Sequence, residues 1–269
     1  MNEKLVNEIV INKPLIEPVF RVINKPEIDS VFSERPKLGD DALYGVIGKL
    51  FKKVEPQTEA DIPAMIFQFL AFISCYIGDK RYYMIGPNPQ NPTIFVNICG
   101  PTSRGAKGTG LSVVKYLLNK VVPDWMNNNV TEGLSSGEGL IFNLRDRTDD
   151  DIGVPDKRIV FIEEEFASFL KRMHRHGNTI GQLIRTMWDG GTLATKTRNN
   201  PMTARNPLAS LIVHITDDEL KKLLDLVDMV DGFFNRFIMA YSERSKSLPH
   251  GGDFESIDMS DEISYLKRI

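Results

Sequence analysis

Apolar residues run almost without interruption through four short stretches of the chain, and this pattern predicts buried strands. The stretches are residues 93–99, 158–162, 208–215 and 232–241. A strand that is apolar at consecutive positions buries both of its faces, which is typical of parallel sheets covered by helices on two sides. The sequence therefore predicts a sheet at the centre of a layered protein.

Between these stretches, apolar residues recur at the three- and four-residue spacing of helices that bury one face. Helices are predicted over residues 42–54 and 62–77, after the segment that follows Cys99, and over residues 166–173, 180–188 and 217–227. The order of strands and helices indicates an α/β fold with a mainly parallel central sheet flanked by helices.

The composition changes this picture little. Of 269 residues 42% are hydrophobic, and the formal net charge is −3, so any contact with nucleic acid must come from a local patch. Cys75 and Cys99 lie in apolar stretches, as expected of buried reduced thiols. No signal peptide and no apolar run long enough for a membrane span are recognised. A cytoplasmic protein without a membrane segment is expected.

Proline positions and charge divide the chain into three parts. Four prolines among short apolar clusters predict that residues 1–42 form an extended arm. Residues 43–252 contain the predicted strands and helices of the core. Residues 253–269 are expected to begin a C-terminal helical segment that is truncated at the end of the chain.

A glycine-rich segment, GPTSRGAKGTG at residues 100–110, links a predicted strand to a predicted helix. Such a turn directs backbone N–H groups and the positive end of the helix dipole at one point, where a triphosphate can bind. The usual spacing is Gly, four residues, then Gly-Lys-Ser/Thr, and here Ala106 is inserted before Lys107. We expect the loop to bulge at Gly108, because glycine tolerates positive φ, and Thr109 to reach Mg²⁺. The residues expected to bind ATP are Gly100, Thr102, Ser103, Arg104, Gly105, Lys107, Gly108 and Thr109.

Carboxylates follow two of the predicted strands. Glu163, Glu164 and Glu165 come directly after residues 158–162, and ligands bind at the carboxyl ends of parallel strands. Glu163 is expected to hold Mg²⁺ with Thr109, while Glu164 or Glu165 orients the attacking water. The loop and these acids should converge across adjoining parallel strands. The three glutamates are also compatible with a solvated helix start.

Glu138 is a second candidate for the residue that orients water. It stands three residues after Ser135 and before an apolar run, so it is equally well interpreted as part of a capping box.

Three basic residues of a predicted hairpin are candidate contacts with nucleic acid. Residues 192–198 alternate as a strand before a turn, and a second strand follows the turn, so a β-hairpin inserted before residue 208 is predicted. Its Lys196, Arg198 and Arg205 either touch a nucleic-acid backbone or keep an exposed edge soluble.

Polar residues near the last two predicted strands are the remaining candidate site residues. Thr216 and Asn235 are candidate γ-phosphate sensors, although Thr216 also begins a capping box with Glu219. Arg236 is a candidate to reach a phosphate in its own or a neighbouring subunit.

Six segments in this order resemble a P-loop NTPase family, long described as of unknown function, that occurs in primase–helicase-like proteins of phages, plasmids and bacterial genomes. They are GPTSRGAKGTG, GLSSGEGLI, RIVFIEEEFASFL, RHGNTIGQLIRTMWDGGTL, LIVHITDDEL and GFFNRF. The resemblance covers roughly residues 43–252 and implies a RecA/AAA-like nucleotide-binding core, sometimes with a primase-polymerase domain upstream, which is not found in this sequence. The family's loop has Arg-Lys where this chain has Ala106-Lys107.

The resemblance and the residues together predict an ATP-hydrolysing replication protein, a helicase-like motor on single-stranded DNA with ATP and Mg²⁺ as cofactors. Glu164 or Glu165 would orient water as in AAA-type ATPases, or Glu138 as in recombinase-type ATPases. A homo-oligomeric ring and a primase partner are expected. The alternatives are a non-catalytic nucleic-acid-binding or assembly module, and a small-molecule kinase for which no acceptor pocket is recognised.

Overall fold

The computed structural model of the chain describes residues 38–134, 136–195, 201–223 and 232–269. The elements discussed below belong to one unit, Gly39–Ile269. Nearly all of the predicted amino-terminal arm lies outside the described residues, and so do Ser135, Lys196 and Arg198.

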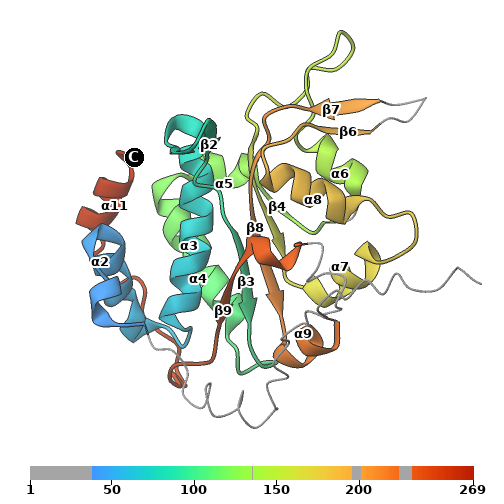
Figure 1. The fold of residues 1–269 in the computed structure, drawn as a ribbon. Helices are drawn as coiled ribbons and strands as arrows, with labels where there is room; N and C mark the ends of the chain where they lie inside the picture. Colours follow the sequence, from blue (N-terminus) through green and yellow to red (C-terminus); the bar gives the residue numbers. More distant parts are fainter. Residues whose placement is uncertain (1–37, 135, 196–200, 224–231) are drawn as a thin grey trace, which may run out of the picture. The chain divides into compact units, whose positions relative to one another are not determined.

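Five parallel strands form the central sheet in the order β4-β5-β8-β3-β9 (Figure 1). Their bounds are β3 Phe95–Cys99, β4 Val130–Glu132, β5 Arg158–Glu163, β8 Leu208–Ile215 and β9 Phe237–Tyr241. The apolar runs thus form strands as predicted, although residues 234–236 form a 3-10 turn before β9. Because the strands are parallel, all five carboxyl ends lie along one edge.

Helices cover both faces of this sheet (Figure 1). One layer contains α2 Gly45–Val54, α3 Ile62–Ile77, α4 Lys107–Val121, α5 Pro123–Asn129 and α11 Ser260–Leu266. The other contains α6 Gly137–Phe142, α7 Phe166–Met173, α8 Ile180–Trp188 and α9 Asp217–Leu223. Val96 and Ile98 of β3 pack toward the first layer, and Phe95 and Cys99 toward the second. The predicted α/β fold is confirmed.

Helix α3 packs against the centre of the sheet and against α4. With the 3-10 turn Gly78–Lys80 it forms the stretch Ile62–Lys80, which is long and apolar enough to cross a membrane. It reaches this length only with Gly78, Asp79 and Lys80, and it contains polar residues, so it is no uninterrupted apolar run. Half of its most apolar window is buried inside the protein, as in the core helix of a globular fold.

Two antiparallel hairpins lie outside the central sheet. The first pairs β1 Tyr83–Ile85 with β2 Asn88–Gln90 and precedes β3. The second, the hairpin predicted from the sequence, pairs β6 Leu193–Thr195 with β7 Met202–Ala204 and precedes β8. Both hairpins therefore lead into the amino ends of central strands, and Figure 1 shows them at the same end of the sheet.

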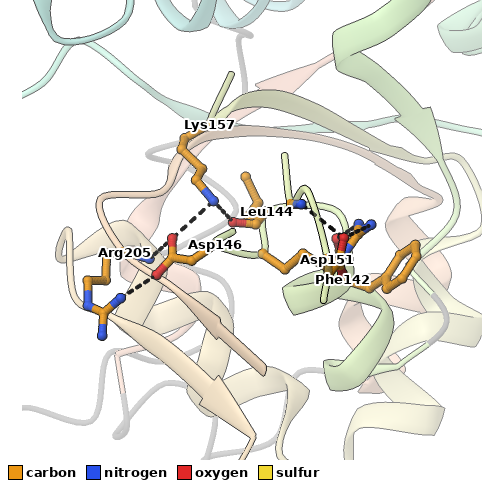
Figure 2. Close-up of polar contacts among 8 residues, drawn as sticks. Phe142, Leu144, Asp146, Asp151, Lys157 and Arg205 are labelled. Atoms are coloured by element: carbon orange, nitrogen blue, oxygen red, sulfur yellow. Dashed lines mark hydrogen bonds and ion pairs between the residues drawn. The ribbon is translucent and has the colours of Figure 1, made fainter. Parts of the chain in front are cut away.

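Ion pairs attach the β6–β7 hairpin to the loop that follows α6 (Figure 2). Asp146 accepts hydrogen bonds from the backbone N–H of Arg205 at 3.1 Å and from its guanidinium at 2.8 Å, and Lys157 lies 3.1 Å from the same carboxylate. Burial raises the pKa of the Asp146 carboxyl, but these contacts outweigh it and hold the pKa below its usual range. Arg205, a predicted nucleic-acid contact, is thus already paired.

Helix α11 completes the first helical layer. It packs against α2 and α4, and Leu266 is 1% exposed. The C-terminal helical segment is therefore part of the core of this unit.

Replacing Leu266 by alanine should lower the free energy of unfolding by about 2–5 kcal/mol, because the deletion leaves a cavity between packed helices. Ile269→Ala is the matched control: its side chain is 52% exposed, and its effect should stay within about 0.5 kcal/mol. Urea denaturation monitored by circular dichroism measures both. Equal effects would show that α11 does not contribute to the core.

Candidate functional site

The loop between β3 and α4 lies at the carboxyl edge of the sheet. Ser103 and Ala106 adopt left-handed backbone angles, with φ of 60° and 45°, and Ala106 directly precedes α4. Gly108 lies inside the first turn of the helix. The predicted bulge at Gly108 is therefore wrong, because the two left-handed residues before the helix accommodate the irregular loop.

The first turn of α4 presents backbone donors without a protein cap. The N–H groups of residues 107–109 have no partner within the helix, since the acceptors would lie before its start. Among the described residues no side chain caps them, and Ala106 at the cap position has only a methyl group. With the positive end of the helix dipole at the same place, this helix start favours an anion.

Lys107 adds a positive charge at this point. Its Nζ donates to the carbonyl oxygen of Gly100 at 2.6 Å and lies 3.5 Å from that of Pro101. Partial burial lowers the pKa of Lys107, and the nearby carboxylates of Asp217 and Glu219 act in the opposite direction. The ammonium group therefore folds over the loop, where it can exchange backbone oxygens for oxygens of a bound anion.

The segment that follows β9 braces the loop, which the sequence analysis did not foresee. Ser242 is buried, its N–H donates to Cys99 O at 2.7 Å, and its Oγ donates to Gly105 O at 2.6 Å. The N–H of Arg244 donates to Arg104 O at 2.7 Å. A Cβ at Gly100 would overlap the carbonyl oxygen of Ser242, so this position requires glycine.

A cavity of about 340 Å³ lies beside the loop. The predicted site residues that line it are Thr102, Ser103, Lys107, Glu164, Glu165 and Thr216. The loop and the acids thus face one space, but not across adjoining strands as expected, because β8 lies between β3 and β5.

Glu163 and Glu164 have different surroundings. Glu163 is 6% exposed, accepts from the N–H of Leu134 at 3.1 Å, and lies 3.4 Å from the guanidinium of Arg172 in α7. Glu164 lines the cavity, and its Oε2 lies 3.3 Å from the position of a Cβ at Gly108 in α4. Glu163, the last residue of β5, faces the same layer as Phe161, whereas Glu164 follows in the turn and lies beside the loop helix α4.

A buried histidine connects Glu164 to helix α3. His214 is 3% exposed near the end of β8, with Nε2 3.0 Å from Gln68 Oε1 and Nδ1 3.5 Å from Glu164 Oε2. Gln68 donates its own amide to Ala64 O at 3.1 Å, which fixes its oxygen toward the ring. The hydrogen bond with His214 lowers the pKa of Glu164 and outweighs the partial burial that raises it.

The predicted metal ligand Thr109 does not line the cavity and is exposed on α4. The residue next to Glu164 is Gly108, which has no hydroxyl group. Because Lys107 and Thr109 are two helical positions apart, they point in different directions around the helix axis.

Glu138 is exposed in α6, outside the residues that line the cavity. The observed cap of α6 is Ser136, whose Oγ accepts from the N–H of Gly139 at 3.0 Å, rather than the predicted Ser135. Thr216 caps the next helix as predicted: its Oγ1 accepts from the Glu219 N–H at 3.2 Å. The side chain of Glu219 accepts from the Thr216 hydroxyl at 2.9 Å, where the predicted box has it accept from the Thr216 backbone N–H.

Asn235 and Arg236 lie before β9, at the amino edge of the sheet. The four residue steps of β9 put this edge about 13 Å from the loop. Arg236 is paired with Asp189 at 3.0 Å. Within its own subunit, this arginine does not reach the cavity.

No group of three or more His, Cys, Asp or Glu residues suited to hold a metal ion by themselves occurs in the described ranges. The comparisons with known proteins give no assignment: no protein-family model matches the chain, and no curated protein matches it.

Gly100→Ala should lower the free energy of unfolding by about 1–3 kcal/mol, because the added methyl must displace either the loop or the strand end that carries Ser242. Gly39→Ala is the control, since a Cβ there meets no atom within 4 Å. Thermal denaturation of both variants measures the difference. An unchanged melting temperature for Gly100→Ala would contradict the close approach described here.

Proposed function

We propose that the chain binds and hydrolyses ATP and acts as a replication-associated, helicase-like motor on DNA. The observation that carries the proposal is the cavity at the carboxyl edge, where Lys107 and the uncapped start of α4 face Glu164 and Glu165. Cationic and N–H donors on one side and carboxylates on the other are what a magnesium-bound triphosphate requires.

The residues present fit ATP and Mg²⁺. Lys107 and the N–H groups of the first turn of α4 would hold the phosphates, and Glu164 would hold the metal directly or through water. The bound metal supplies charge neutralisation at the transferred phosphoryl group.

The strand order supports a RecA/AAA-like core. Numbered along the chain from the loop strand, the sheet reads 5-1-4-3-2, with β8 between the loop strand and the acid strand. A parallel sheet flanked by helices, with the loop after its central strand β3, is compatible with the P-loop fold that the resemblance of the sequence implies. Fold likeness is an argument by analogy, and the catalytic assignment depends on the cavity.

We assign the acids other roles than those expected from the sequence. Glu164 takes the metal-facing position, because Glu163 is engaged with Leu134 and Arg172 on the other side of the sheet. Glu165 lines the cavity and is the residue we assign to orienting water. His214 holds Glu164 in its charged form, and Thr216 contributes a hydroxyl at the cavity wall.

Arg236 would act only on a neighbouring subunit. Because Arg236 lies at the amino edge, it does not reach the cavity of its own subunit. A role in phosphate binding therefore requires an assembly such as a ring. A ring, a primase partner and a cytoplasmic location remain part of the proposal.

The alternative is a nucleic-acid-binding or assembly module that has lost hydrolysis. One observation favours it: the helix position beside Glu164 is Gly108, so the hydroxyl that usually accompanies the lysine is missing there. Magnesium-dependent ATP hydrolysis with and without single-stranded DNA separates the two, because DNA binding without nucleotide binding would support the module.

Lys107→Ala should abolish ATP turnover without unfolding the protein, because the triphosphate loses its cationic partner. Glu164→Gln and Glu165→Gln should each lower turnover by about 100-fold or more. Phosphate release assays measure turnover, and circular dichroism measures folding.

Glu163→Gln and Glu138→Gln are the controls for these carboxylates. Glu163→Gln should mainly lower the stability, by about 1–3 kcal/mol, because it weakens a buried acceptor of an N–H and a guanidinium group. Glu138→Gln should change neither property. Unchanged turnover in Lys107→Ala would refute the loop assignment, and a Glu138→Gln effect equal to that of Glu165→Gln would refute the assigned base.

Gly108→Ser should tighten magnesium-dependent nucleotide binding, since it places a hydroxyl beside Glu164. Gly108→Ala is the matched control. Both substitutions should raise stability by about 0.5–1 kcal/mol, because glycine is unfavourable in a helix and, among the described residues outside its own helical turn, only Glu164 Oε2 lies near the added Cβ, at 3.3 Å. Isothermal titration with ATP at several Mg²⁺ concentrations tests the difference; identical magnesium dependence in the two variants would place the metal elsewhere.

A further inference from the structure

A second cavity, larger than the one beside the loop, lies at the opposite edge of the sheet. It has a volume of about 840 Å³ and is formed by the β1–β2 hairpin, the end of α8 and the residues that lead into β8. We call it the amino-edge groove. Its lining includes Tyr82, Met84, Trp188, Gln90 and Asn206.

The groove combines aromatic faces with amide side chains. Tyr82 is 60% exposed and Trp188 is 37% exposed, whereas the other tryptophan of the chain, Trp125, is buried. The ring of Trp188 packs edge-on against Phe95 with centroids 4.8 Å apart, which fixes its orientation. Exposed aromatic rings that are held rigidly are the surfaces on which unpaired bases stack.

Further amides come from the hairpin: Asn88 and Asn91 line the groove together with Gln90. Side-chain amides offer both donors and acceptors, and these match the polar edges of nucleobases. Aromatic residues are also enriched at the centres of protein interfaces, so it is the amide side chains beside the rings that favour nucleobases as the ligand of this groove.

The charges around the groove also fit a polyanion at its rim. Of the two acids in the lining, Asp189 is paired with Arg236 at 3.0 Å. The other, Asp79, is followed directly by Lys80 and Arg81, which are exposed and precede Tyr82. The bases would therefore face the groove while the phosphates face the cations of this segment.

We propose that the amino-edge groove binds single-stranded nucleic acid through its bases, which stack on Tyr82 and Trp188. This inference deepens the proposed function, in that it takes the nucleic-acid partner from there, but it requires neither the ATP-binding cavity nor hydrolysis. It also differs from the contacts predicted on the β6–β7 hairpin, because it depends on stacking rather than on basic side chains.

The test uses Trp188 as its own reporter. Trp125→Phe leaves Trp188 as the single tryptophan, and it removes an indole N–H that has no hydrogen-bond partner among the described residues. This variant of the full chain is titrated with a 20-nucleotide oligo-dT and with an abasic phosphodeoxyribose oligomer of the same length. Oligo-dT should quench the Trp188 emission, and the abasic oligomer should not.

Tyr82→Ala in the same background should weaken oligo-dT binding by about 5- to 100-fold, because one stacking platform is lost. Tyr44→Ala is the matched control: Tyr44 is exposed but does not line the groove, and binding should be unchanged. Equal binding of the abasic oligomer would overturn the proposal in favour of phosphate contacts. A change in Trp188 emission with protein concentration alone would show that a second copy occupies the groove, and would also overturn it.

ATP hydrolysis measured on the same samples distinguishes this inference from the proposed function. Quenching by oligo-dT without hydrolysis would refute the motor and support the groove. Hydrolysis without quenching would overturn the groove alone.

Discussion

The parallel pairing of β8 with both β3 and β5 is the constraint on which the site depends. Residues Phe95–Cys99 pair with Leu211–Ile215 on one side of β8, and Arg158–Glu163 pair with Leu208–Val213 on the other. Because the three strands run in one direction, the loop, the end of β8 and the glutamates must emerge at the same edge. A change of direction in any of them would separate the positive and negative groups of the cavity.

The same register explains why a buried histidine is tolerated in β8. His214 pairs opposite Ile98 and lies between Val213 and Ile215 in β8, so its ring needs partners from outside these apolar neighbours. Gln68 from α3 and Glu164 from the loop after β5 are those partners. The resulting contact joins three segments that are distant in sequence, and it holds one carboxylate of the cavity in place.

Much of this could be predicted from the sequence, because it depends on local patterns. Apolar runs identified β5 and β8, and the Thr216 cap was recognised from its spacing to Glu219. The loop conformation was not predictable in the same way. Glycine is the residue expected at positive φ, but in this loop Ser103 and Ala106 adopt positive φ. Gly108 does not, because it belongs to the first turn of α4.

Roles that depend on the order of the strands were also beyond local patterns. Strand alternation puts Glu163 on the same side of β5 as Phe161, but which helices cover that side is decided by the packing of the two layers, and Glu164 already lies in the turn after the strand. The contact between Gln68 and His214 spans 146 residues, so no spacing rule relates them. The only sign of this contact in the sequence is that a glutamine and a histidine each stand within a mainly apolar segment.

Strand β8 also connects the two cavities described above. Leu208, its first residue, lines the amino-edge groove, and His214 and Ile215 at its other end line the cavity beside the loop. The eight residues span about 23 Å. A strand paired on both sides cannot slide by itself without breaking both ladders. If the two cavities influence one another, the influence must therefore come from displacement of the loops at the two ends of β8, or from movement of the sheet as a whole.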